Sequence, residues 1–143
     1  MIVTMSQAGE TFFTVMGCMD GRCQQKVAEY GRQKFGATYP DTITEAGLVG
    51  LLAHNPSNEL LDSLKKKIMI SLGKHHSKGI VIDGHAECAG NPVSDEQHKD
   101  DVRASVALIQ SMIGASVPVL GVFVKRGADN QWVVEDVPET LNA

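Results

Sequence analysis

The chain has 143 residues, of which 43% are hydrophobic and 21% are charged, and its formal net charge is -4. This length suits a single hydrophobic core, so we expect one domain over residues 1–143. The weak negative charge and the lack of a long Lys/Arg run argue against a nucleic-acid partner, and the apolar runs are too short to span a membrane. An odd number of cysteines does not make a disulfide framework, and the N-terminal residues lack a signal-peptide pattern, so we expect a cytoplasmic protein.

The first third of the chain predicts a strand, a helix and a second strand. Residues 11–17 are rich in aromatic and β-branched types, which favours a buried strand. Residues 23–35 carry apolar side chains at helical spacing and are followed by Gly36, a typical helix stop. Residues 37–44 predict a short strand that Pro40 makes irregular or places near a sheet edge.

The middle of the chain predicts helical segments followed by a buried strand. Residues 48–53 are apolar and indicate one or two helical turns. Asn55 is a good helix cap and Pro56 suits the first helical position, so we expect a long helix from Pro56 to about His75. Residues 79–83 form a short β-branched run without alternation, which is typical of a parallel strand covered on both faces.

The last third predicts a helix over 95–113, a strand over 118–125 and a closing strand over 131–137. The intervening residues 127–130 favour a turn, so the last two strands should form a hairpin. Strands that alternate with helices imply crossover connections. We therefore predict an α/β fold with a mainly parallel central sheet of about five strands, an antiparallel edge strand and flanking helices.

Two short motifs follow the two most strand-like segments. Cys18, Asp20 and Arg22 alternate directly after the first strand, and His85 and Cys88 follow residues 79–83. Function in parallel sheets lies at the carboxyl ends of strands, so we expect these motifs to form one site.

The residue types in the two motifs indicate a zinc site. Cys and His are ligands that zinc prefers, and three protein ligands with an open fourth position are typical of catalytic zinc. The fourth ligand could be water or the Asp20 carboxylate, and Arg22 could instead pair with Asp20 and keep it ionised. The alternatives are that the cysteines only pack or act as redox thiols, and that Asp20 caps a helix while Arg22 lies on the surface.

Several other polar residues have two interpretations. Cys23 suits packing, but a thiol at a helix start can also be reactive. His98 has no clear partner in the sequence, and a proton shuttle is its alternative role. The pair His75-His76 is expected to cap a helix end in solvent, His54 has no evident partner, and the Glu87 side chain is expected to point away from the metal.

The motifs carry a resemblance to the β-class carbonic anhydrases. The family pattern is C-x-D-x-R after the first strand and H-x-x-C later in the domain, and the chain has both in a matching strand-loop context. The similarity spans nearly the whole chain. The matching positions are Cys18, Asp20, Arg22, His85 and Cys88, together with Ala46-Gly47, residues 102–106 and the final hairpin.

This resemblance implies a cofactor, a reaction and an assembly. It implies a Zn²⁺ ion held by Cys18, His85 and Cys88, with zinc hydroxide attacking CO2 to give bicarbonate. Asp20 would accept the hydrogen bond of the hydroxide, and Asp20 with Arg22 could act as a switch that closes the site. The resemblance also implies a homodimer or higher homo-oligomer whose pocket the neighbouring subunit completes.

The chain departs from the family pattern at three positions near the motifs. Glu45 replaces a usually basic residue, Ala86 replaces Thr or Ser, and Ala89 replaces Gly. Because of these changes, one alternative to CO2 hydration is a non-catalytic zinc-binding homologue. A second alternative is hydrolysis of carbonyl sulfide or carbon disulfide at the same site, since zinc hydroxide could attack any of these linear electrophiles.

Overall fold

The computed structural model describes residues 6–139, so expectations for residues 1–5 and 140–143 lie outside the described part. Its elements in chain order are β1 (Phe12–Gly17), α1 (Gly21–Phe35), β2 (Tyr39–Thr44), α2 (Leu48–Ala53), α3 (Asn58–Gly73), β3 (Ile80–His85), α4 (Asp95–Ile113), β4 (Val119–Arg126) and β5 (Trp132–Val137). Among the described residues, no helix combines the length and the apolar character needed to cross a membrane.

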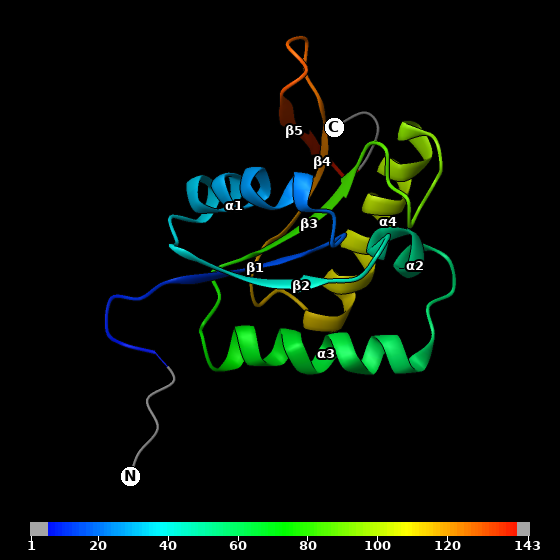
Figure 1. The fold of residues 1–143 in the computed structure, drawn as a ribbon. Coiled ribbons are helices and arrows are strands. Elements are labelled where there is room, and N and C mark those ends of the chain that lie inside the picture. Colours follow the sequence, from blue (N-terminus) through cyan, green and yellow to red (C-terminus); the bar gives the residue numbers. More distant parts are fainter. Residues whose placement is uncertain (1–5, 140–143) are drawn as a thin grey trace.

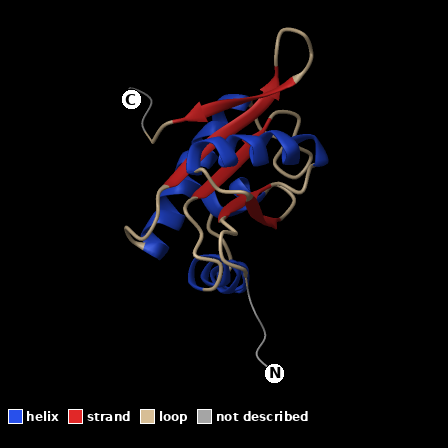
Figure 2. Ribbon diagram, turned by 90° about the vertical axis from the view of Figure 1, so that its left-hand side faces the viewer, coloured by secondary structure: helices blue, strands red, loops and turns tan. Residues whose placement is uncertain are grey.

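The strands form one five-stranded sheet in the order β2-β1-β3-β4-β5. The pairs β1·β2, β1·β3 and β3·β4 are parallel, whereas β4 and β5 are antiparallel. The loop of the β4–β5 hairpin extends beyond the rest of the sheet (Figures 1 and 2). The predicted α/β fold with an antiparallel edge strand is therefore confirmed.

Helices cover both faces of this sheet, with α1 on one side and α3 and α4 on the other (Figure 1). The alternation of side chains along β1 explains the two layers. Phe13 and Val15 pack in a core cluster with Val27 of α1. Met16 packs in the opposite cluster with Leu64 of α3, and that cluster also contains residues of α2 and α4. Because both faces are covered, all residues of β3 are buried, as the unalternating sequence predicted.

Two helix starts differ from the prediction. The long helix α3 begins at Asn58 rather than Pro56, because the Ser57 hydroxyl caps it by accepting a hydrogen bond from Leu60 N at 3.2 Å. Asn55 has a φ of 55°, which takes it out of the cap geometry. Helix α1 begins at Gly21, two residues early, because Asp20 acts as its N-cap.

Two histidines that had no predicted partner lie against distant carboxylates. The Nδ1 atom of His75 lies 2.8 Å from Asp41 Oδ2, so the prediction that His75 only caps a helix in solvent was wrong. The Nε2 atom of His54 lies 2.9 Å from Asp101 Oδ1. Both carboxylates come from elements more than 30 residues away in the chain, which local sequence patterns do not reveal.

Candidate metal centre

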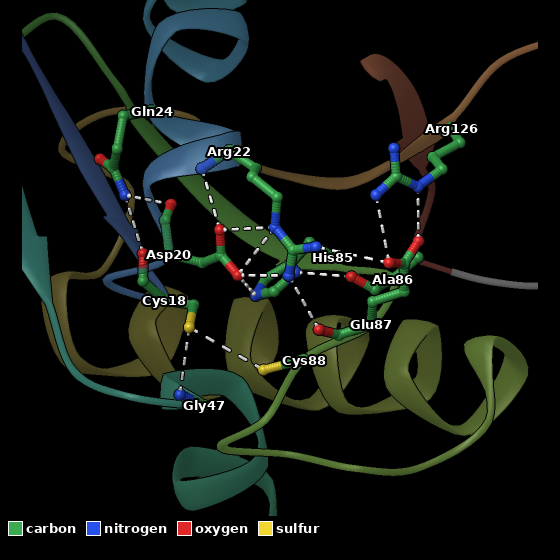
Figure 3. Close-up of polar contacts among 10 residues, drawn as sticks. All are labelled: Cys18, Asp20, Arg22, Gln24, Gly47, His85, Ala86, Glu87, Cys88 and Arg126. Carbon is green, nitrogen blue, oxygen red and sulfur yellow. Dashed lines mark hydrogen bonds and ion pairs between the residues drawn. The ribbon is translucent and has the colours of Figure 1, made fainter. Parts of the chain in front are cut away.

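The two motifs lie at the carboxyl ends of neighbouring parallel strands. Cys18 directly follows β1, His85 is the last residue of β3, and Cys88 lies in the loop after it. Because β1 and β3 pair in parallel, both loops lie at the same edge of the sheet. Figure 3 shows the side chains of the two motifs facing one another across this edge.

Three potential ligands converge at this point. One ligating atom from each of Cys18, His85 and Cys88 lies within 4.8 Å of the others, and the two sulfur atoms are 3.8 Å apart. The three residues are at most 7% exposed. Two thiols and an imidazole form the soft, borderline donor set that suits zinc.

The hydrogen bonds of His85 determine which nitrogen is available. Its Nδ1 lies 2.7 Å from the backbone carbonyl of Ala86. A carbonyl only accepts, so Nδ1 carries the ring proton and Nε2 carries the lone pair. Nε2 is buried and has no hydrogen-bond partner among the described residues. An unpartnered buried polar atom costs about 1–3 kcal/mol, so a bound cation would remove an unfavourable feature of the fold.

Backbone N–H groups face both sulfur atoms. The N–H of Gly47 donates to Cys18 Sγ at 3.4 Å. Burial and the neighbouring Cys18 raise the pKa of the Cys88 thiol, whereas the N–H groups of Asn91 and Gly90 act in the opposite direction. A cation at the site would favour both thiolates and oppose the first two effects. The residues present therefore fit a zinc ion.

Asp20 lies at the rim of this group and pairs with Arg22. The guanidinium Nε and Nη2 atoms donate to Asp20 Oδ1 and Oδ2 at 3.0 and 2.7 Å. The hydrogen bonds from Arg22 lower the pKa of Asp20 to about 2, so the carboxylate is ionised at neutral pH. Asp20 Oδ2 is also 4.0 Å from His85 Nε2. The carboxylate thus faces both Arg22 and the candidate metal position, and it caps α1 as well.

The structure favours packing for Cys23 and does not support a proton shuttle at His98. Cys23 is fully buried in the apolar cluster beneath α1, and burial raises the pKa of its thiol. The His98 ring is also buried and lies 5.5 Å from Phe123 and 6.0 Å from His85, measured between ring centroids. Burial lowers the pKa of His98. A proton shuttle must exchange protons with solvent, and this position does not provide that access.

The buried carboxyl group of Asp83 was not singled out from the sequence. It accepts a hydrogen bond from the backbone of Cys18, and burial raises its pKa to about 8. Its Oδ1 atom has no partner among the described residues. Gly17 leaves room for this side chain, because a Cβ atom there would collide with it. Asp83 ends an apolar run in the sequence, and no sequence pattern indicated that its carboxyl group accepts a hydrogen bond from the Cys18 backbone.

The fold and the Cys–His–Cys group together define an α/β protein of the β-carbonic anhydrase type, and comparison with known proteins supports this. A family model described as "Putative carbonic anhydrase" matches residues 8–138. The chain therefore belongs to the β-class carbonic anhydrase family. No curated protein sequence matches the chain significantly.

Solved structures of carbonic anhydrases share this fold at low sequence identity. The enzyme of Streptococcus mutans is 18% identical, with 87% of this chain and 81% of that chain covered and a TM-score of 0.55. For a β-carbonic anhydrase of Trichomonas vaginalis the values are 12%, 96%, 90% and 0.58. For one of two tetrameric β-carbonic anhydrases of Sordaria macrospora they are 14%, 90%, 82% and 0.59.

Proposed function

We propose that this protein is a zinc-dependent carbonic anhydrase that converts CO2 reversibly to bicarbonate, with Cys18, His85 and Cys88 as the metal ligands. The observation that carries the proposal is the buried His85 Nε2, which has no hydrogen-bond partner within residues 6–139, beside two buried thiols. When bound, Zn²⁺ would lower the pKa of a coordinated water from about 15.7 toward 7 and so supply a nucleophile at neutral pH.

In this proposal Asp20 is the catalytic residue and Arg22 positions it. Asp20 Oδ2 lies 4.0 Å from His85 Nε2, so it can accept a hydrogen bond from a group bound at the metal position. This bond would orient the lone pair of the nucleophile toward the carbon of CO2. Arg22 holds the carboxylate by hydrogen bonds from its guanidinium Nε and Nη2 atoms and keeps it ionised, which an acceptor requires.

The direct test is metal analysis followed by stopped-flow CO2 hydration. We expect one zinc per chain and a hydration rate well above that of buffer at neutral and mildly alkaline pH. Carbonyl sulfide and carbon disulfide should be assayed in parallel, because the same site chemistry could act on them. Zinc-loaded protein that turns over none of these substrates would contradict an enzymatic role, and turnover of a sulfur substrate alone would reassign it.

A pair of cysteine variants tests the ligand assignment. Cys88→Ser should lose stoichiometric zinc, because an alcohol is a poor zinc ligand at neutral pH. Cys23→Ala is the matched control: this thiol is also buried, but it lies outside the Cys–His–Cys group, so zinc should be retained. Full zinc occupancy in Cys88→Ser would show that the assignment is wrong.

We also propose that the protein forms a homodimer or a higher homo-oligomer. The Sordaria relatives are tetrameric. In this chain, Met19, Leu51 and Val93 are 65%, 43% and 41% exposed. Met19 follows Cys18, Leu51 lies in α2, and Val93 lies in the loop after Cys88. A subunit contact that covered these side chains would remove them from water, which is favourable. Light scattering coupled to size exclusion should give a mass of at least two chains, and a monomer at micromolar concentration would contradict the proposal.

A further inference from the structure

The Asp20 carboxylate has two possible partners. Its Oδ2 atom is 2.7 Å from Arg22 Nη2 and 4.0 Å from His85 Nε2. A cation at the Cys–His–Cys group would attract the same carboxylate that Arg22 now holds. If Arg22 holds Asp20, a small anion or substrate could bind at a metal held by the Cys–His–Cys group. If Asp20 moves to the metal, it would occupy that position itself.

Arg22 is held by more than Asp20. Its Nη2 atom donates to the Glu87 backbone carbonyl at 3.1 Å, and its Nη1 atom donates to Glu87 Oε1 at 3.4 Å. The guanidinium also lies over the Trp132 ring, 5.1 Å from the centroid. Glu87 stands between the two presumed ligands His85 and Cys88 in the sequence. The position of Arg22 is therefore coupled to the loop that carries them.

Arg126 at the end of β4 directs the Glu87 carboxylate. Its Nε and Nη2 atoms donate to Glu87 Oε2 and Oε1 at 2.8 and 3.3 Å, and Figure 3 shows this pair beside Arg22. The Arg126 guanidinium lies over the same Trp132 ring, 4.5 Å from its centroid. Glu87 makes its shorter hydrogen bond to Arg126, at 2.8 Å, and its longer one to Arg22, at 3.4 Å. It therefore contacts the Arg22 guanidinium without displacing Asp20 from it.

We propose that Glu87, held by Arg126, is a positioning residue that keeps the Arg22 guanidinium on Asp20 and thereby keeps Asp20 away from the metal position. This inference rests on the proposed metal site and adds the residues that set the balance between its open and closed forms. Glu87 does not touch the metal position in this arrangement, because its carboxylate points to the two arginines. It would act only through Arg22 and Asp20.

The test uses the cobalt-loaded protein and sodium azide. The azide ion binds at an open fourth position and changes the absorption spectrum of the cobalt. In Glu87→Gln, Arg22 loses its second carboxylate, so Asp20 competes better for the metal. Azide affinity should fall about two- to fivefold, the range expected for a partly exposed ion pair. Removing a negative charge near the site would by itself strengthen azide binding, so the expected change has the opposite sign.

Two further variants separate this mechanism from a general loop effect. Glu29→Gln removes an exposed glutamate whose nearest ion-pair partner is Lys26 at 3.9 Å, and it should leave azide affinity unchanged. In an Asp20→Asn background no carboxylate competes for the metal, so adding Glu87→Gln should no longer weaken azide binding. If Glu87→Gln does not fold, Arg126→Met tests the same arrangement, and its effect should likewise disappear in the Asp20→Asn background.

The outcomes distinguish this inference from the proposed function. Wild-type protein that binds no cobalt would overturn the proposed metal site and the inference with it. Normal cobalt binding with equal azide affinity in wild type and Glu87→Gln would overturn the inference alone. An equal loss of affinity with and without Asp20 would also overturn it, because Glu87 would then act through the ligand loop.

Discussion

Gly47 and Gly90 meet backbone to backbone between the two ligand loops. A Cβ atom at Gly90 would lie 2.6 Å from Gly47 N, and Gly47 has a left-handed φ of 65°. The same Gly47 N–H donates to Cys18 Sγ. The close approach of these glycines thus holds the Cys18 and Cys88 loops together. The family pattern drew attention to Ala89, whereas the glycine that this packing requires is its neighbour Gly90.

Substitution of Gly90 should therefore disturb both stability and the site. We expect Gly90→Ala to lower the free energy of unfolding by about 1–3 kcal/mol, because the added methyl group forces two backbones apart. Zinc affinity should fall as well, since Cys88 moves with this loop. Gly73→Ala is the control: in the described part of the chain, a Cβ at Gly73 has no neighbour within 4 Å. Denaturant unfolding and zinc titration check both, and equal behaviour of the two variants would contradict the packing argument.

At the level of single residues, the sequence was informative where the chemistry is local. The spacing of Cys18, Asp20 and Arg22 indicated a ligand and an ion pair, and the structure shows the Asp20–Arg22 pair directly. The sequence could not place Arg126 against Glu87, because these residues lie 39 positions apart. The contact depends on the register of β3 and β4, in which His85 pairs with Val124, and no local spacing encodes that register.

Helix α4 supports the ligand loop through a buried carboxylate. Asp101 is 1% exposed and accepts hydrogen bonds from Gln97, from Asn91 and from His54, each at 2.9 Å. Asn91 follows Cys88 in the loop, and its backbone N–H faces the Cys88 thiol. Asp101 therefore connects α4 and the residue after α2 to the loop that carries a presumed ligand.

Removal of this carboxylate should destabilise the protein more than removal of any one exposed partner. We expect Asp101→Ala to lower the free energy of unfolding by about 1–3 kcal/mol, because it leaves the buried Asn91 amide without its acceptor. The His54 side chain is 62% exposed, so His54→Ala should change stability by no more than about 0.5 kcal/mol. Urea unfolding of the two variants decides the matter, and similar losses would argue against a supporting role for Asp101.

Strand β5 is tied to its neighbours by Glu135. Its carboxylate lies 2.7 Å from Lys99 Nζ of α4 and 2.8 Å from Lys125 Nζ of β4. Hydrogen bonds from Lys125 and Lys99 lower the pKa of Glu135 below its usual value. A lowered pKa in the folded state means that this stabilisation is fully present above the unfolded value and is lost as the pH falls through the folded one.

Glu135→Gln should therefore have a pH-dependent effect on stability. At neutral pH we expect a loss of about 0.2–1 kcal/mol, the range for partly exposed ion pairs. The difference from wild type should shrink once the pH falls below about 4.3, the usual glutamate pKa, as the wild-type carboxylate becomes protonated. Glu96→Gln is a control, because Glu96 is 80% exposed and 3.7 Å from Lys99. A difference that persists unchanged into acid would exclude the ion pair as its cause.

The type and order of the elements could be predicted from the sequence, but their exact limits could not. The β-branched run before His85 indicated a fully buried strand, because a run without alternation is typical of a strand covered on both faces. The start of α3 was predicted at the Asn55-Pro56 signal, yet Ser57 provides the cap. Adjacent residues with similar capping ability compete, and the path of the preceding loop decides between them.

Across the whole molecule, the candidate site joins segments that are far apart in the chain. Cys18 and Cys88 are separated by 70 residues, and they come from loops after two different strands. At the site, Gly47 joins these loops, because its N–H donates to Cys18 Sγ and its backbone packs on Gly90. A metal ion held by both loops would bind the folded chain and not the unfolded one, where the ligands are dispersed.

Zinc should consequently stabilise the entire fold rather than one loop. At a free zinc concentration about 100-fold above the dissociation constant, the free energy of unfolding should rise by about 2.7 kcal/mol. Thermal unfolding with buffered zinc, compared with chelator-treated protein, measures this shift. Cys23→Ala should show the same gain, whereas Cys88→Ser should show little, because it lacks one of the three ligands. An equal gain in Cys88→Ser would mean that zinc stabilises the protein through other groups.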